Sequence, residues 1–317
     1  MVSLNSIPIV PLLLATYLAF SGIRKGSLSP SGGIAAFVVG FAMLSVPLRV
    51  FGVSLIVFYL TGSKATKVGK ELKAKLEDGH QAAGYRNATQ VLCNSLSAFV
   101  ASLLWSAIYV PGSLPSSLLS GIVASQTAYD FDQWCPLTPP SSFQASRILL
   151  FVTLGHFACC LGDTLASELG ILSKSRPRLV TTLQTVPPGT NGGMSTLGTL
   201  ASAAGGVIIG LTILLSLLVE SSRCRAEWFN IASTLVGWGA FAGLLGSLLD
   251  SLMGATLQQT RYSGESKKIL TEESLDSALH GADVKTISGI DVLSNSQVNL
   301  LSAIATAGLL GWLALKF

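Results

Sequence analysis

Long apolar runs separated by shorter polar segments make up most of the chain. An α-helix needs roughly 20 apolar residues to cross a bilayer, with about 17 as a lower limit. Eight runs meet or approach this length: 7–23, 32–48, 50–61, 91–110, 147–161, 196–219, 229–249 and 300–317. The stretch 114–128 is short and rich in serine, so it is interpreted as a segment that dips into the membrane and returns. The pattern predicts an all-α, polytopic transmembrane helix bundle of about eight spans, within a range of roughly seven to ten.

Three polar segments between these runs carry most of the basic residues. They are a basic loop at 62–90, an acidic and glycine-rich loop at 162–195, and a polar loop at 255–298. Lysine and arginine accumulate in the cytosolic loops of membrane proteins, so all three segments are predicted to face the cytosol. Two spans between each pair of neighbouring segments return the chain to the cytosol. Three spans before the first segment and one after the third then place both termini outside the cytosol. Arg223 and Arg225 then fall in an external loop, which is evidence against this orientation.

The composition agrees with a membrane protein. The 317 residues are 50% hydrophobic and 11% charged, with a mean hydropathy of +0.59, whereas a soluble domain is about 25% charged. Residues 1–317 are therefore expected to form a single integral membrane domain. The net charge of +4 is spread over separate loops, which argues against nucleic acid and favours the lipid bilayer as the partner. Five cysteines without a CxxC pair indicate neither a zinc site nor a disulfide framework.

Residues 162–170 (GDTLASELG) place two carboxylates beside an apolar run. Ionisable groups at a membrane are costly to keep and are functional candidates by default. Asp163 and Glu168 are about 140° apart around a regular helix, so separate roles or a helix break near Gly162 are expected. One interpretation makes Asp163 only the N-cap of the helix that follows. The other assigns both carboxylates to catalysis and Mg²⁺ binding, with Thr164 and Ser167 as polar neighbours.

Residues 187–193 (PPGTNGG) cannot continue a helix. Their glycines would allow backbone NH groups to converge on an anion. A helix is expected to start directly afterwards, capped by Ser195 or Thr196, with its positive end toward this turn. The candidate phosphate-binding residues here are Gly189, Thr190, Asn191, Gly192 and Gly193, with Lys174 from the same loop. The alternative is an ordinary turn between helices. The sequence has no GxxxxGK[ST] motif, which argues against a P-loop nucleotide site.

Other polar candidates lie near the ends of the apolar runs. Lys64, Lys67 and Lys70 recur every three residues and would share one helix face. Lys64 and Lys67 are assigned to phosphate binding together with Arg86, whose guanidinium suits phosphate oxygens. A juxtamembrane basic loop that contacts anionic lipid is the alternative. Asp250, at the end of an apolar run, is a third catalytic candidate. The remaining polar candidates are Asn87, Asn94, Ser251, Gln297 and Asn299, and the likeness of residues 90–94 to 297–299 hints at an internal repeat.

Five segments together resemble the transmembrane protein 19 family, which is related to the membrane phytyl-phosphate kinases of plants and prokaryotes. They are GYRNATQVL, GDTLASELG, VPPGTNGGMSTLGTLAS, GLLGSLLDSLMGATLQ and NSQVNLLSA, in this order along the chain. The resemblance implies Mg²⁺ and a nucleoside triphosphate, often CTP, as cofactors. It implies that Asp163 and Glu168 organise Mg²⁺ and phosphate, that Asn191, Gly192 and Gly193 cradle phosphate, and that Asp250 is a second acidic contributor. Leu165 stands where many relatives have tryptophan.

The leading hypothesis is an integral membrane isoprenyl-monophosphate kinase. An isoprenoid tail partitions into lipid and leaves its phosphate at headgroup depth, where the polar segments meet the spans. The alternatives are a membrane transporter or lipid flippase, suggested by the small-residue helices and the repeat, and a noncatalytic membrane protein. The resemblance places the protein in an internal membrane such as the endoplasmic reticulum.

Overall fold

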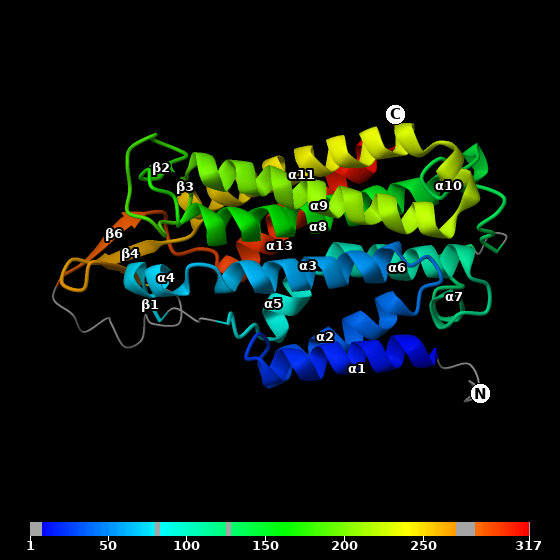
Figure 1. The fold of residues 1–317 in the computed structure, drawn as a ribbon, viewed down its shortest axis with the longest axis horizontal. Helices are drawn as coiled ribbons and strands as arrows, with labels where there is room; N and C mark the ends of the chain where they lie inside the picture. The colour runs from blue at the N-terminus through cyan, green and yellow to red at the C-terminus, as the bar shows by residue number, and fades with distance from the viewer. Residues whose placement is uncertain (1–7, 80–82, 125–127, 271–282, 317) are drawn as a thin grey trace.

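The computed structural model describes residues 8–79, 83–124, 128–270 and 283–316. Long helices lie along the long axis of the molecule, and short strands gather at one end (Figure 1). The long helices are α1 (Ile9–Arg24), α2 (Pro30–Leu44), α3 (Val50–Lys67), α6 (Leu96–Tyr109), α8 (Gln144–Gly170), α9 (Thr196–Glu220), α11 (Trp228–Leu257) and α13 (Asn295–Leu313). Shorter helices are α4 (Lys70–Leu76), α5 (Ala88–Cys93), α7 (Leu114–Leu118), the 3-10 turn Ser141–Phe143 and α10 (Ser222–Ala226).

Seven of the eight predicted apolar runs each correspond to one of the long helices, whereas the run 91–110 is divided between α5 and α6. In the described part of the chain, α8, α9, α11 and α13 are long and apolar enough to cross a membrane, whereas α1, α2 and α6 are apolar but shorter. α8 alone has 27 residues, or about 40 Å of helix. In segment 114–128, α7 covers 5 residues and is followed by turns, and residues 125–127 lie outside the described residues. The helices are those of a multi-pass membrane protein.

α8 is continuous through Gly162, so the predicted helix break there is wrong and Asp163 is not an N-cap. Gly162 serves close packing instead. A Cβ atom at this position would lie 2.8 Å from the Gly243 Cα atom in α11 and 3.0 Å from the Ser202 carbonyl oxygen in α9. Small residues allow membrane helices to approach this closely. The glycine therefore brings α8, α9 and α11 together, which positions Asp163 on a central helix of the bundle.

The segment 62–90 is largely helical, which corrects its prediction as a loop. α3 continues to Lys67, and α4 begins at Lys70 after a break at Gly69, whose φ of +67° favours glycine. Lys64 and Lys67 therefore belong to one helix and Lys70 to the next, so the three lysines do not share a face. After the break, α4 lies at the strand end of the molecule (Figure 1).

Short strands make the fold mainly helical rather than purely helical. β1 (Glu77–Asp78), β5 (Lys268–Leu270), β4 (Thr260–Ser263) and β6 (Val284–Ser288) form a sheet in this order, in which only β1 and β5 are parallel. β2 (Arg178–Leu179) pairs antiparallel with β3 (Gly193–Met194). Both sheets lie at one end of the bundle (Figure 1). These strands have two to five residues, too few for the alternating pattern that identifies a strand in a sequence.

The resemblance between residues 90–94 and 297–299 has a local explanation. Asn87 and Gln90 form a capping box at the start of α5, and Ser294 and Gln297 form one at the start of α13. In each box the side chain of the first residue accepts a hydrogen bond from the glutamine backbone amide, and the glutamine side-chain oxygen accepts one from the backbone amide of the first residue. The repeated glutamine therefore reflects two similar helix starts.

A disulfide joins Cys135 to Cys224, which corrects the prediction that the cysteines form no disulfide. Cys224 lies in α10, at the end of the bundle opposite the strands (Figure 1). The two cysteines are 89 residues apart, so no short spacing pattern could have revealed their pairing. Structural disulfides persist in oxidising compartments and are rare in the cytosol. The disulfide therefore favours an α10 end that faces away from the cytosol, in agreement with the orientation predicted from the three basic segments, although Arg223 and Arg225 argue against it.

We expect Cys135 and Cys224 to be oxidised in native membranes. Protein extracted with an alkylating agent present should migrate faster on a non-reducing gel than after reduction, because the closed loop is more compact. Cys135→Ser should abolish the difference. Cys93→Ser is the matched control, since Cys93 is buried and free. Identical mobility of the wild-type protein with and without reductant would contradict a disulfide at this end.

Candidate functional site

A polar cavity of about 460 Å³ lies at the strand end of the bundle. α8, the turn before α9, α11, α13 and the segment before α5 all contribute to it. It is lined by most of the residues that the sequence analysis selected: Arg86, Asn94, Asp163, Thr164, Ser167, Glu168, Gly189, Thr190, Asn191, Gly192, Gly193, Asp250, Ser251 and Asn299. Segments as distant in sequence as residues 86 and 299 thus meet in one cavity.

Five of the selected residues do not line the polar cavity. Lys64, Lys67 and Lys174 are exposed, so their assignment to phosphate binding in this cavity is wrong. Asn87 and Gln297 are also exposed, and their side chains are used in the two capping boxes. These five residues share polar character with the others, but they lie on helix faces or in caps that turn away from the cavity.

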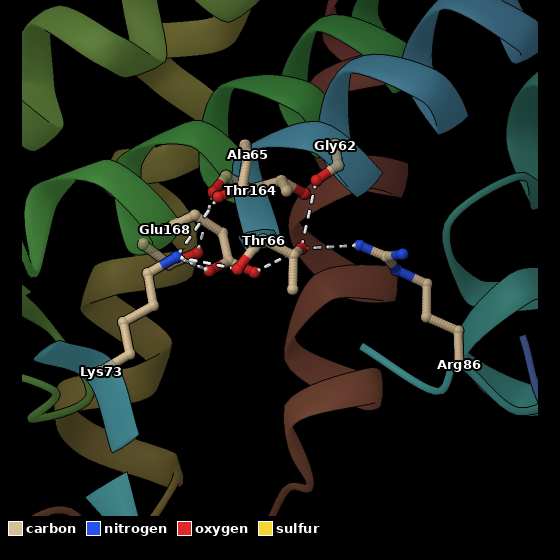
Figure 2. Close-up of polar contacts among 8 residues, drawn as sticks. Gly62, Ala65, Thr66, Lys73, Arg86, Thr164 and Glu168 are labelled. Carbon is tan, nitrogen blue, oxygen red and sulfur yellow. Dashed lines mark hydrogen bonds and ion pairs between the residues drawn. The ribbon is translucent and has the colours of Figure 1, made fainter. Parts of the chain in front are cut away.

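Glu168 belongs to a buried polar network at one wall of the cavity (Figure 2). The Lys73 ammonium donates to Glu168 Oε2 at 2.6 Å, and the Thr66 hydroxyl donates to Glu168 Oε1 at 2.7 Å. Lys73 also donates to the carbonyl oxygens of Ala65 and Thr66, both at 3.3 Å. Both oxygens of Glu168 are therefore engaged by α3 and α4, so this carboxylate is poorly suited to the metal-binding role that the sequence analysis gave it.

Lys73 is a charged cavity residue that the sequence analysis missed. Its side chain is only 1% exposed, although it lies in the strongly polar helix α4. Six basic residues occur in the segment 62–90, and nothing in their spacing separates Lys73 from the others. Its partner Glu168 is 95 residues away in sequence, so only the packing of α4 against α8 identifies the pair.

Arg86 extends the network toward α5. Its guanidinium donates to the Thr66 hydroxyl at 3.2 Å and to the Ser63 hydroxyl at 3.3 Å. Its backbone is held by the start of α2, because the Arg86 amide donates to Ser27 O at 3.1 Å and Arg86 O accepts from Ser29 N at 3.0 Å. Burial lowers the pKa of the Arg86 guanidinium, and the Glu168 carboxylate partly opposes this shift. Arg86 is thus a fixed cation at the edge of the cavity.

Asp163 and Asp250 form a second acidic group, between α8 and α11. Both line the polar cavity, and among the described residues neither takes part in an ion pair. Asp250 Oδ2 accepts from the Ser302 hydroxyl at 3.4 Å. With the Asn299 amide oriented so that both of its polar ends are satisfied, its NH₂ group donates to the same oxygen at 2.9 Å. Two residues of α13 therefore hold the Asp250 carboxylate. The Asp163 carboxylate has no cationic partner among the described residues.

The glycine-rich turn is packed against α11. Gly192 has a φ of +75°, and a Cβ atom there would lie 2.5 Å from the Ser251 carbonyl oxygen, so only glycine fits. Thr190 N donates to Pro187 O at 3.3 Å, Gly193 N to Thr190 O at 2.9 Å, and Asn191 N to the Thr260 hydroxyl at 3.1 Å. These three amides are consumed within the protein, which corrects the expectation that the whole turn offers its NH groups to an anion.

The start of α9 follows the glycine-rich turn and also lines the polar cavity. Its N-cap is one of the two residues that the sequence analysis predicted. Ser195 is its N-cap and accepts from Gly198 N at 3.1 Å. Ser195, Gly198 and Thr199 all line the polar cavity, so the positive end of the α9 dipole points into it.

The charge of the cavity wall limits what it can bind. Among the described residues that line it, the charged ones are four carboxylates, on Glu77, Asp163, Glu168 and Asp250, and two cations, on Lys73 and Arg86. A phosphate group would need further positive charge to enter. The described residues contain no group of three or more His, Cys, Asp or Glu side chains arranged to hold a metal. Mg²⁺ does not need such a group, since it retains several waters and uses one or two carboxylates beside substrate phosphates. The Asp163–Asp250 pair fits this donor set.

Comparison with known proteins places the chain among membrane proteins. It is 36% identical to Protein PGR of Arabidopsis thaliana over 94% of this chain and 93% of that protein. It is 28% identical to an uncharacterised membrane protein of Methanocaldococcus jannaschii over 79% of this chain and 83% of the relative, and 28% identical to one of Synechocystis over 76% of each. No solved structure matches it. The model of the family described as integral membrane protein DUF92 matches residues 13–307, and the chain therefore belongs to this family.

Proposed function

We propose that this protein is an isoprenyl-monophosphate kinase, which transfers a phosphoryl group from a nucleoside triphosphate to a lipid monophosphate. The observation that carries the proposal is the meeting of Asp163, Asp250 and Arg86 in one polar cavity with the start of α9. The resemblance of the five sequence segments to the transmembrane protein 19 family and its kinase relatives suggests the reaction, with CTP as the first donor to test.

Phosphoryl transfer asks the protein mainly for positioning and for neutralisation of charge. We assign the metal-binding role to Asp163 and Asp250 rather than to Asp163 and Glu168, because Lys73 and Thr66 already engage both oxygens of Glu168. Mg²⁺, when bound there, would supply the positive charge that the cavity wall lacks. Arg86 would hold the phosphate of the lipid, since its planar guanidinium matches phosphate oxygens. An oxygen of that phosphate would attack the terminal phosphorus of the nucleotide, and the nucleoside diphosphate would leave.

The proposed reaction also orients the protein. We propose that all eight long helices cross the bilayer, α6 together with α5, so that the cavity faces the cytosol, where nucleoside triphosphates are available. The opposite end, with α10 and the Cys135–Cys224 disulfide, then faces an oxidising compartment. An internal membrane such as that of the endoplasmic reticulum meets both conditions.

The reaction is tested directly with purified protein in detergent. We expect a diphosphate product from farnesyl, geranylgeranyl or phytyl monophosphate in the presence of Mg²⁺ and a nucleoside triphosphate labelled in its terminal phosphate. Removing the metal with a chelator should reduce the rate by at least about 10³-fold, because neutralisation of phosphate charge by a metal is worth several kcal/mol. Addition of Mg²⁺ in excess of the chelator should restore the rate.

Two outcomes would overturn the proposal. One is the absence of labelled product with every combination of CTP, ATP, GTP or UTP and the three lipid phosphates. The other is movement of lipid phosphate across liposome membranes that contain the protein, without consumption of triphosphate. This second result would favour a transporter or flippase.

A further inference from the structure

A second, apolar cavity adjoins the polar one. Its walls come from α1, α2 and α3, and they include Ala15, Ala19, Ala36, Val39, Gly40 and Phe58. Arg86, Gln90, Asn94 and Thr164 border both cavities. We call this space the apolar slot. It therefore begins where the polar cavity ends, beside the Arg86 guanidinium.

The slot is lined by residues of α1, α2, α3 and α5. The α1–α2 pair flanks the rest of the bundle on one side (Figure 1). The outward faces of α1 and α2 are strongly apolar, with Leu13, Tyr17, Ile34 and Val38 at least half exposed. Such a surface is expected to contact lipid tails. The slot is thus separated from the bilayer by a single layer of helix, and a lipid could enter it sideways.

Two polar side chains that line the slot have partners within the protein. The Tyr59 hydroxyl lies 2.8 Å from the Ser27 hydroxyl, and the Arg86 guanidinium bonds to Ser63 and Thr66. Along its length the slot therefore offers apolar contacts, with charge only at the Arg86 end. The matching ligand has one anionic head and a hydrocarbon chain that starts directly behind it.

We propose that the apolar slot binds the first part of the hydrocarbon tail of the lipid monophosphate and that Ala36 makes room for it. This inference rests on the proposed function, because it takes the phosphate at Arg86 to be that of the substrate. Ala36 lies on α2, is partly buried and faces the slot. A phenylalanine at this position would fill the slot without altering the charged residues of the polar cavity.

The test compares Ala36→Phe with Val38→Phe, which adds the same ring to the outward face of α2, where Val38 is 53% exposed. The substrates are dimethylallyl, geranyl, farnesyl and geranylgeranyl monophosphate. Filling the slot should lower kcat/KM for the farnesyl and geranylgeranyl compounds by at least about tenfold, in line with the discrimination that apolar pockets achieve. The dimethylallyl compound places only five carbons in the slot and should therefore lose the least kcat/KM, and Val38→Phe should match wild type throughout. If Ala36→Phe lowered kcat/KM equally for every chain length, or for none, the proposal that the slot binds the tail would be refuted.

A binding measurement separates the slot from the reaction. A geranylgeranyl monophosphate with a photoreactive diazirine near its phosphate should label wild-type residues of α2 and α3 that line the slot, such as Val39 and Phe58. Labelling should be lost in Ala36→Phe and kept in Val38→Phe, whether or not diphosphate forms. If wild type is labelled in the slot but forms no product, the kinase proposal fails and the slot stands. If labelling is confined to outward residues while product forms, the slot is wrong and the kinase proposal stands.

Discussion

Replacing Asp163 with asparagine is expected to reduce phosphoryl transfer by at least about 10³-fold, which corresponds to about 4 kcal/mol of transition-state stabilisation. The substitution keeps the size of the side chain and removes one of the two carboxylates proposed to hold Mg²⁺. Asp163 has no cationic partner among the described residues and lines the same cavity as Asp250. Its charge therefore contributes little to folding, and the variant should unfold at the wild-type temperature or above it. Initial rates and thermal unfolding are measured on the same detergent preparation.

Asp132→Asn is the matched control for this experiment. Asp132 is exposed, and its carbonyl oxygen accepts from Arg223 Nε at 3.1 Å, next to α10 at the far end of the bundle. The same chemical change there should leave turnover unchanged. If Asp163→Asn retains wild-type turnover, Asp163 does not bind the metal. If the biological role of the protein also survives loss of both Asp163 and Glu168, a noncatalytic membrane protein becomes the better explanation.

Replacing Glu168 with glutamine is expected to destabilise the protein by about 3–5 kcal/mol. Lys73 is only 1% exposed, and its ammonium lies 2.6 Å from the Glu168 carboxylate. The glutamine leaves that ammonium buried beside two carbonyl oxygens without an opposite charge. Removing one partner of a buried ion pair is costly because the remaining charge keeps its desolvation penalty. A clear drop in the temperature of thermal unfolding should follow.

A double variant distinguishes an unpaired buried charge from simple disruption of packing. Lys73→Met combined with Glu168→Gln removes both charges, so it should recover much of the stability lost in Glu168→Gln alone. Lys285→Met provides the comparison at the surface, where Lys285 and Asp283 are 78% and 53% exposed. Breaking that pair should cost less than about 1 kcal/mol. Equal unfolding temperatures for Glu168→Gln and Lys285→Met would show that the Lys73–Glu168 pair contributes little.

Local sequence predicted the helical part of this fold well. The runs 196–219 and 229–249 became α9 and α11, and Ser195 caps α9 as expected, because hydropathy and capping depend on neighbours within a few turns. Even the candidate site was largely recognised, since costly polar residues such as Asp163 and Asp250 stand out in apolar surroundings. The same reasoning selected Lys64 and Lys67 incorrectly, because a lysine on an exposed helix face has the same local sequence features as one in a cavity.

Tertiary structure alone decided which of these polar groups meet and how each is used. Lys73 pairs with Glu168, which is 95 residues away in sequence, and Cys135 forms a disulfide with Cys224, which is 89 residues away. A glycine such as Gly162 is often found at a helix break, yet α8 continues through it and packs closely against Gly243. The sequence by itself determined that apolar helices would bury against lipid and one another and that a small set of charges would be exceptional. Partners of those charges depend on contacts between distant helices, which no local pattern of residues encodes.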